Sequence, residues 1–217
     1  LSRWTFDGST NSVMPGAAKE GAVISAGRLL LPSAGAHFET APLPLELREK
    51  TLEAWVSLSD LDQGGGAAIS LERTDGQGFD AIVFGERQPR KWTAGSEGFT
   101  RTRDLDAPLE DAPPGAWIHL AAVYSLDHQV ALYRNGEPYG KPYTSGTPLM
   151  SFKAGEARVI LGRRHKDGGR PWLTGAILQA ALHDRALSPA EVAASFRSGG
   201  FTVSQAEMLS GLSESQR

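Results

Sequence analysis

The sequence predicts an all-β domain, and three observations support this prediction. Gly and Pro account for 25 and 13 of the 217 residues, more than in an average protein. Short runs of β-type residues recur between turn residues. In the clearest run, apolar and polar residues alternate with a period of two. We expect strands near residues 22–31, 36–40, 50–58, 66–73, 79–86, 90–95, 98–103, 116–124, 128–135, 138–144, 156–162 and 174–184.

The clearest alternation lies in residues 51–58. Every second side chain is apolar and is expected to face the core: Leu52, Ala54, Val56 and Leu58. The opposite face is mixed and carries Thr51, Glu53, Trp55 and Ser57. This pattern predicts a strand with an apolar core face.

Two further segments define the middle and one edge of a sheet. Residues 117–124 are largely apolar on both faces, which predicts a central strand. Asn135-Gly136 separates two strand-like runs and suits a tight turn with positive φ at both positions. Because Pro138 and Pro142 cannot donate ladder hydrogen bonds, the returning strand should be irregular or at an edge.

Helix is expected only near the C-terminus. Ser188 is a suitable N-cap, Pro189 suits the first helical position, and Glu191 completes a capping box. Gly199-Gly200 should end this helix. A second capping box over 204–207 opens a polar tail. We therefore expect a β-sandwich domain over 1–200 and a helical tail or linker over 201–217.

Composition excludes several classes of function. The 22 Lys and Arg residues against 25 Asp and Glu residues give a net charge of −3, which argues against a nucleic-acid partner. The chain lacks Cys, which excludes disulfides and thiolate zinc sites. The sequence contains no run of 18 apolar residues, so no segment is predicted to insert into a membrane. The start at Leu1 suggests a domain or fragment of a longer chain.

Several stretches occur in the order found in one known family. They begin at Trp4-Thr5-Phe6-Asp7-Gly8 and continue through 51–56, 117–124, 132–136, 160–163 and 175–177 to His183-Asp184-Arg185-Ala186-Leu187-Ser188. This ordered set, over about residues 4 to 192, resembles the bacterial laminin G-like (LamG-like) jelly rolls of the concanavalin A-like lectin/glucanase superfamily. The resemblance implies a jelly-roll sandwich of two antiparallel sheets with one short helix and the helical tail.

The same resemblance carries functional expectations. Such modules usually belong to large extracytoplasmic proteins and bind glycans or protein partners, sometimes with calcium. Acidic residues that often follow the Gly-x-Ile of the last long strand are replaced here by Leu178 and Gln179. Calcium prefers several oxygen ligands, usually including carboxylates. We therefore expect no cofactor, with Asp7 as the remaining candidate ligand if calcium binds.

The carboxylates do not predict a glycosidase. Glycosidic cleavage needs two carboxylates about 5–9 Å apart, one of them protonated, and catalytic relatives place acidic residues alternately on one strand. The nearest match, residues 104–111, has the wrong spacing and contains Pro108, which indicates a loop. Glu53 has no acidic partner on its strand face. The sequence therefore predicts a non-enzyme.

Other candidate binding residues are basic or aromatic. Arg163 and Arg164 begin a basic loop that could bind an anionic glycan or could simply be solvated. Trp92, with Arg90 beside it, is our first choice for an exposed sugar-stacking platform. Trp55 either lines a concave surface or is covered by an outer layer. His119 is expected to be a buried or sheet-face histidine.

Three functions remain open. The preferred one is a non-catalytic carbohydrate-binding module within a larger extracytoplasmic (periplasmic, cell-surface or secreted) bacterial protein. The second is a protein-interaction or spacer domain that contacts neighbouring domains through an apolar patch near residues 204–217. The third is a glycoside hydrolase with an unrecognised site.

Overall fold

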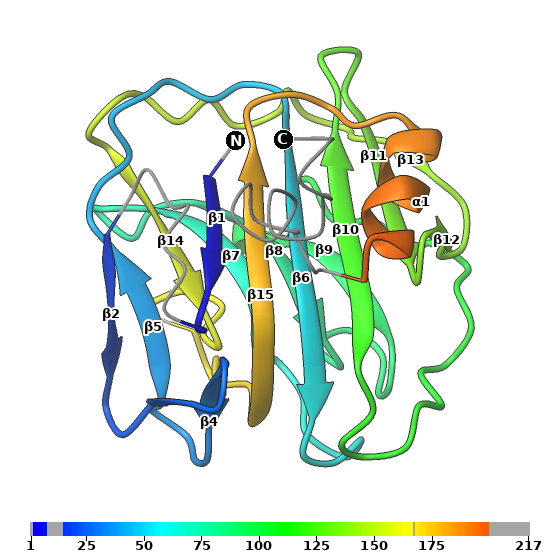
Figure 1. Ribbon diagram of the computed structural model, residues 1–217. Helices are drawn as coiled ribbons and strands as arrows, with labels where there is room; N and C mark the ends of the chain where they lie inside the picture. The colour runs from blue at the N-terminus through cyan, green and yellow to red at the C-terminus, as the bar shows by residue number, and fades with distance from the viewer. Residues whose placement is uncertain (1, 8–14, 167, 200–217) are drawn as a thin grey trace, which may run out of the picture.

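Two antiparallel β-sheets packed face to face form the protein, as shown by a computed structural model that describes residues 2–7, 15–166 and 168–199. Figure 1 shows the larger sheet towards the viewer, with the helix α1 (Pro189–Arg197) on its outer side. The predicted all-β sandwich is therefore confirmed.

The larger sheet is built around β6 (Lys50–Leu58). Its main strand order is β12-β11-β10-β6-β15-β4-β3, with β1 paired to β15 and β13 paired to β11. The other strands are β1 (Ser2–Thr5), β3 (Val23–Ser25), β4 (Arg28–Leu31), β10 (Ile118–Tyr124), β11 (Gln129–Arg134), β12 (Glu137–Pro138), β13 (Tyr143–Thr144) and β15 (Gly175–His183).

The smaller sheet has the strand order β2-β5-β14-β7-β8-β9. Its strands are β2 (Gly16–Lys19), β5 (His37–Thr40), β7 (Ala67–Arg73), β8 (Phe79–Phe84), β9 (Trp92–Ser96) and β14 (Ala157–Leu161). Consecutive strands β6 and β7 lie in different sheets, as do β14 and β15. The loops that join them therefore cross between the sheets at one end of the sandwich.

The core confirms the predicted alternation. Leu52, Ala54, Val56 and Leu58 of β6 are all buried in the main apolar cluster. All seven residues of β10 are buried, and this strand lies between β11 and β6 as a central strand should. A wholly buried ion pair, Lys50 Nζ to Asp80 Oδ2 at 2.9 Å, also joins the two sheets.

The hairpin and the helix form as their sequences predict. Asn135 and Gly136 have φ values of 51° and 81°, and Arg134 pairs with Glu137 across the turn. The returning strand β12 lies at the sheet edge. Ser188 Oγ accepts from the backbone N–H of Glu191, and the Glu191 side chain accepts from the backbone N–H of Ser188, which completes the capping box.

Three strand predictions need correction, and one strand was not predicted. Residues 98–103 hold the end of a 3₁₀ helix over Glu97–Phe99, because Gly98 and Phe99 both have positive φ and Arg101 turns inward to Asp80. Residues 22–31 divide into β3 and β4 around a turn. Residues 138–144 contain only the last residue of β12 and the two-residue strand β13. Strand β2 was not expected, because its small residues carry little β signal.

The predicted tail over 201–217 lies outside the described residues, and so does the apolar patch expected near it. Within the residues that the structure describes, no helix has the length and apolar character needed to span a bilayer.

Candidate functional site: a polar cavity at the rim

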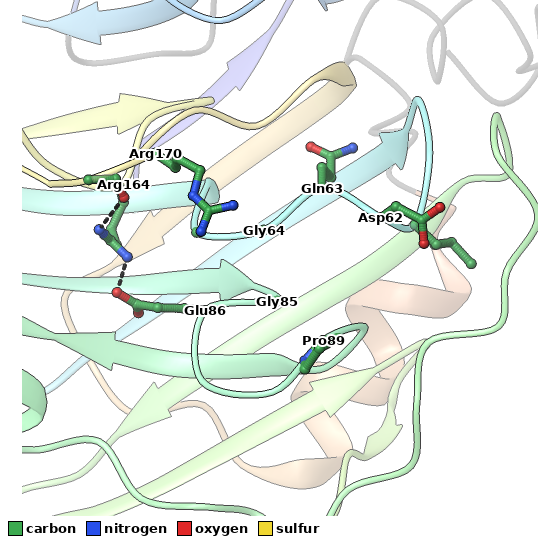
Figure 2. A pocket seen from close by; sticks show the side chains of 11 residues that line it. Asp62, Gln63, Gly64, Gly85, Glu86, Pro89, Arg164 and Arg170 are labelled. Atoms are coloured by element: carbon green, nitrogen blue, oxygen red, sulfur yellow. Dashed lines mark hydrogen bonds and ion pairs between the residues drawn. The ribbon is translucent and has the colours of Figure 1, made fainter.

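A polar cavity of about 330 Å³ opens at the end of the sandwich, where three loops meet. The loops are residues 59–66 between β6 and β7, 85–91 between β8 and β9, and 162–174 between β14 and β15. Figure 2 shows polar side chains from all three loops around this space. The walls of this rim cavity are formed by Leu61, Asp62, Gln63, Gly64, Gly65, Gly85, Glu86, Pro89, Arg164, Gly169 and Arg170.

Glycines bring the first loop close to the other two. A Cβ at Gly64 would lie 2.7 Å from the carbonyl oxygen of Gly85, and one at Gly65 would lie 2.6 Å from that of Arg170. Gly65 also has a φ of 92°, which favours glycine over any other residue. The glycine run therefore allows the close backbone contacts that form the cavity walls.

Side-chain hydrogen bonds fix the same loop in place. Gln63 Oε1 accepts from the backbone N–H of Thr174 at 2.8 Å, and Gln63 Nε2 donates to the carbonyl oxygen of Thr174 at 2.9 Å. Asp60 Oδ1 accepts from the backbone N–H groups of Asp62 and Gln63. The cavity wall is therefore held in position before any ligand arrives.

An ion pair between Arg164 and Glu86 lies in the wall, with side chains that are only 7% and 13% exposed. Arg164 Nη2 also donates to the carbonyl oxygen of Gly169 at 3.2 Å. Burial lowers the pKa of Arg164, although an arginine remains charged at neutral pH. Glu86 Oε1 accepts from Arg164, whereas Glu86 Oε2 is buried without a hydrogen-bond partner among the described residues. The wall therefore contains an unused acceptor.

Two other charged groups line the cavity and differ in their pairing. Asp62 Oδ1 accepts from Arg90 Nη2 at 3.2 Å, and both side chains are exposed. Arg170 is exposed, and within the described ranges its side chain has no hydrogen-bond or ion-pair partner. The predicted residue Arg90 therefore lies beside the cavity, and Arg170 supplies an additional guanidinium that the prediction did not single out.

Arg163 and Arg164 separate, although they are neighbours in the predicted basic loop. Arg163 lies over the outer face of the smaller sheet, where its Nη2 is 3.5 Å from Glu39 Oε2 and 3.5 Å from Glu72 Oε2. The Trp172 ring lies 5.8 Å from the Arg163 guanidinium carbon. Arg163 is thus buried in an ion-pair network, whereas Arg164 lines the rim cavity.

Trp92 is not an exposed platform, and that expectation is wrong. Its side chain is 1% exposed, its ring lies 4.7 Å from that of Phe84, and its Nε1 donates to Glu110 Oε2 at 2.9 Å. Trp92 begins β9, in which Trp92 and Ala94 face the core. The polar turn just before the strand had suggested exposure.

Trp55 is covered by an outer layer, which was one of the two alternatives for it. Its ring stacks on Phe196 of α1 at a centroid distance of 5.6 Å and lies 5.3 Å from the ring of His119. The stack occupies one face of the indole, so Trp55 does not offer that face to a sugar.

Beside Trp55, the Glu53 carboxylate uses both of its oxygens. Glu53 Oε1 lies 2.6 Å from His119 Nε2, and Glu53 Oε2 lies 3.0 Å from His183 Nε2. Burial alone would raise the pKa of Glu53, but the hydrogen bonds from the two histidines lower it well below its usual range. His119 is fully buried on the sheet face, as expected. This cluster lies beneath α1 and away from the rim cavity.

The candidate calcium ligand Asp7 follows β1 and is exposed. Nowhere in the described part of the chain do three or more His, Asp or Glu side chains form a group able to hold a metal ion. The nearby Gln179 pairs with Thr5 across β15 and β1, and its Oε1 is buried without a partner in the described ranges. One carboxylate and one amide do not fit the several oxygen ligands that calcium takes.

The buried carboxylate in the predicted acidic stretch, Glu110, is not poised as an acid. A glycosidic general acid needs a raised pKa. Burial opposes ionisation of Glu110, but hydrogen bonds from Arg134, the backbone N–H of Ala112 and Trp92 lower its pKa. Residues 100–117 contain no helix or strand, so the acidic stretch 104–111 is a loop, as predicted.

Comparison with known proteins places these features in a family. A sequence profile of the concanavalin A-like lectin/glucanases superfamily matches residues 32–193. No curated protein sequence matches the chain. The match agrees with the resemblance that the ordered sequence stretches indicated.

Solved structures share the fold at low sequence identity. Domain 4 of AbnA, a GH43 extracellular arabinanase from Geobacillus stearothermophilus in complex with arabinotriose, has a TM-score of 0.60 and 18% identity, covering 88% of this chain and 86% of that one. The heptameric SAP-like pentraxin of Limulus polyphemus has a TM-score of 0.62 and 20% identity, covering 78% and 81%. Trypanosoma rangeli sialidase has a TM-score of 0.60 and 16% identity, covering 87% of this chain but only 30% of the sialidase. At these identities the likeness establishes the fold alone.

Proposed function

The chain belongs to the concanavalin A-like lectin/glucanases superfamily, and on this basis we propose that it is a non-catalytic module that binds a carbohydrate in the rim cavity. The fold is shared by enzymes and by binding domains, so the function depends on the residues of the site and not on the fold. The proposal also takes the module to be part of a larger extracytoplasmic bacterial protein.

The observation that carries the proposal is the unused hydrogen-bonding capacity of the rim cavity. Glu86 Oε2 is buried without a donor in the described residues, although a buried acceptor left unpaired costs about 1–3 kcal/mol. A sugar hydroxyl can supply the missing donor once the Glu86 side chain turns this covered oxygen towards the cavity. The ion pair with Arg164 limits that motion to a small shift, so little conformational freedom is lost on binding.

The composition of the walls suits a polar, hydroxyl-rich ligand. Carboxylate and guanidinium groups form hydrogen bonds with sugar hydroxyls, and Leu61 and Pro89 offer limited apolar contact. The lining residues include no aromatic ring, so sugar stacking contributes little. We therefore expect modest affinity, dominated by hydrogen bonds.

The arabinanase domain supports the choice of ligand class. That domain was solved in complex with arabinotriose and covers nearly the same length of chain. The carboxylates of the cavity argue against catalysis, because Glu86 and Asp62 are both engaged in ion pairs with guanidinium groups, whereas a glycosidase keeps one carboxylic acid protonated.

Binding should be tested first on an array of neutral and acidic polysaccharides and then by calorimetry with oligosaccharides of the best binder. Glu86→Gln removes the carboxylate acceptor and should weaken binding about tenfold or more. Glu137→Gln, at an exposed edge-strand position, is the matched control and should bind like the unmodified protein. No reducing sugar should be released from any substrate on the array.

Three results would contradict the proposal. Binding to none of the glycans together with tight binding to a protein would favour the interaction-domain alternative. Sugar release would favour the hydrolase. Equal affinity in the Glu86→Gln variant would place the ligand outside the rim cavity.

A further inference from the structure

We propose that the carbohydrate held in the rim cavity is acidic, and that Arg170 binds its oxyanion. This inference rests on the proposed function and deepens it by naming the ligand class. The shared chemistry is a sugar-borne oxyanion, either the carboxylate of a uronic acid or a sulfate ester.

The charges around the rim cavity do not cancel. Two carboxylates, Asp62 and Glu86, are matched by two guanidinium groups, Arg90 and Arg164. Arg170 adds a third guanidinium at the same opening. Arg170 is therefore the charged group of the cavity lining that has no ion-pair partner among the described residues.

Arg170 is available for this role. Its side chain is exposed and makes no hydrogen bond or ion pair within the described ranges, so a ligand need not displace a protein partner. In Figure 2 its guanidinium extends towards Gly64 along the edge of the cavity. A guanidinium presents a planar fork of donors that matches two oxygens of a carboxylate.

The backbone at Arg170 gives a second reason to assign it a role in binding. Arg170 has a φ of 49°, in the left-handed region that favours glycine. Two glycines, Gly168 and Gly169, directly precede it, yet arginine occupies the left-handed position. Strained positions of this kind recur at ligand-binding sites. The carbonyl oxygen of Arg170 also contacts the Gly65 backbone closely, which fixes the loop that carries the side chain.

Glu86 does not exclude an anion, because Arg164 neutralises it. Glu86 and Arg170 would then bind different groups of the same ligand. Glu86 Oε2 accepts from a hydroxyl, and Arg170 donates to the oxyanion. A ligand with an acidic group and adjacent hydroxyls satisfies both, whereas a neutral sugar satisfies only the first.

The test compares acidic polysaccharides with their neutral derivatives by calorimetry. The probes are oligosaccharides of polygalacturonate and alginate, the same oligosaccharides after reduction of their carboxyl groups to alcohols, sulfated carrageenan oligosaccharides, and neutral arabinan and xylan oligosaccharides. We expect at least one acidic probe to bind about tenfold to a hundredfold more tightly than its neutral counterpart. Comparing the uronic acid and carrageenan arms identifies which oxyanion is preferred.

Variants then assign the preference to Arg170. Arg170→Gln should reduce affinity for the acidic probe to about that of the neutral one, with a much smaller loss for the neutral probe. Arg170→Lys should retain part of the affinity, because an ammonium supplies charge without the planar fork. Arg28→Gln, at an exposed position on β4, should change neither.

Two outcomes overturn the inference while leaving carbohydrate binding intact. They are equal affinity for acidic and neutral probes, and an acidic preference that survives in Arg170→Gln. Failure of every probe, acidic and neutral alike, would instead contradict the proposed function itself.

Discussion

Two largely buried carboxylates, Glu53 beneath α1 and Glu86 at the rim, are used in opposite ways. Glu53 has a histidine nitrogen on each oxygen, at 2.6 and 3.0 Å. Glu86 has Arg164 on one oxygen and no partner among the described residues on the other. Both are anions in a polar cluster, but only one of them has capacity left for a ligand.

This difference in hydrogen bonding suggests that Glu53 stabilises the fold, whereas Glu86 is available for ligand binding. A carboxylate with both oxygens bonded holds the fold together, and its loss leaves other buried groups without partners. A carboxylate with one free oxygen contributes less to the fold and can accept a ligand hydroxyl.

The largest expected effect is on the stability of the α1 side. Glu53→Ala leaves His119 and His183 without their shared carboxylate and should lower the free energy of unfolding by about 3–5 kcal/mol. Urea denaturation measures this loss, with Glu137→Ala as the exposed control. Glu53→Gln, which keeps the side-chain volume, should fall between the two. If the Glu53→Ala variant were as stable as the control, the cluster would have no structural role.

Acid should weaken the same cluster selectively. The pKa of Glu53 in the folded protein is lowered from its usual 4.5 despite burial, because His119 and His183 donate hydrogen bonds to its carboxylate. Its stabilising contribution is therefore complete above pH 4.5 and is lost as the pH falls below that value towards the lowered pKa. Between about pH 4.5 and pH 3 the unmodified protein should lose more stability than Glu53→Gln. Parallel curves for the two proteins would contradict this linkage.

A smaller effect should follow from loosening the helix that covers Trp55. Ser188→Ala removes the side-chain acceptor of the capping box and should cost about 0.5–2 kcal/mol. Because Phe196 stacks on Trp55, tryptophan fluorescence should report the loosened helix. Affinity at the rim cavity should not change, and a change would mean that the two regions are coupled.

At the rim, stability and binding should respond in opposite directions. Arg170→Gly relieves the left-handed backbone at this position and should raise the free energy of unfolding by about 1 kcal/mol. The same change removes the free guanidinium and should abolish the preference for acidic sugars. A variant that loses stability would indicate that Arg170 supports the fold instead.

The smallest expected effect is that of calcium. Asp7 is the only carboxylate we expected at the family's cation position, and calcium prefers several oxygen ligands. Thermal unfolding with and without calcium should therefore give the same Tm. An increase in Tm that disappears in Asp7→Asn would identify Asp7 as a ligand, because a ligand that binds only the folded state stabilises it.

The sequence predicted the parts of the molecule that depend on local pattern. The buried face of β6, the turn at Asn135-Gly136 and the capping box at Ser188 all follow from period, turn chemistry and spacing. It failed where burial depended on distant partners. Trp92 looked exposed beside its basic neighbours, but Glu110, 18 positions away in the chain, accepts its indole N–H in the core.

The candidate site was predicted only in part, for the same reason. Arg90 and Arg164 were identified, but Glu86 and Arg170 become significant only when three loops meet. The glycine run at 64–66 was visible in the sequence, and its role appears only when Gly64 and Gly65 contact the backbones of Gly85 and Arg170. No spacing within one loop could have indicated that arrangement.

Mapping the ligand by nuclear magnetic resonance tests the central claim most directly. Nitrogen-labelled protein would be titrated with the tightest-binding oligosaccharide, and the backbone amide shifts would be followed. We expect the largest shifts in residues 62–65, 85–86 and 169–170, which line the rim cavity, with little change around Glu53 and α1. Shifts concentrated beneath α1 or on the outer face of the smaller sheet, with none at the rim, would contradict the assignment of the rim cavity as the carbohydrate site.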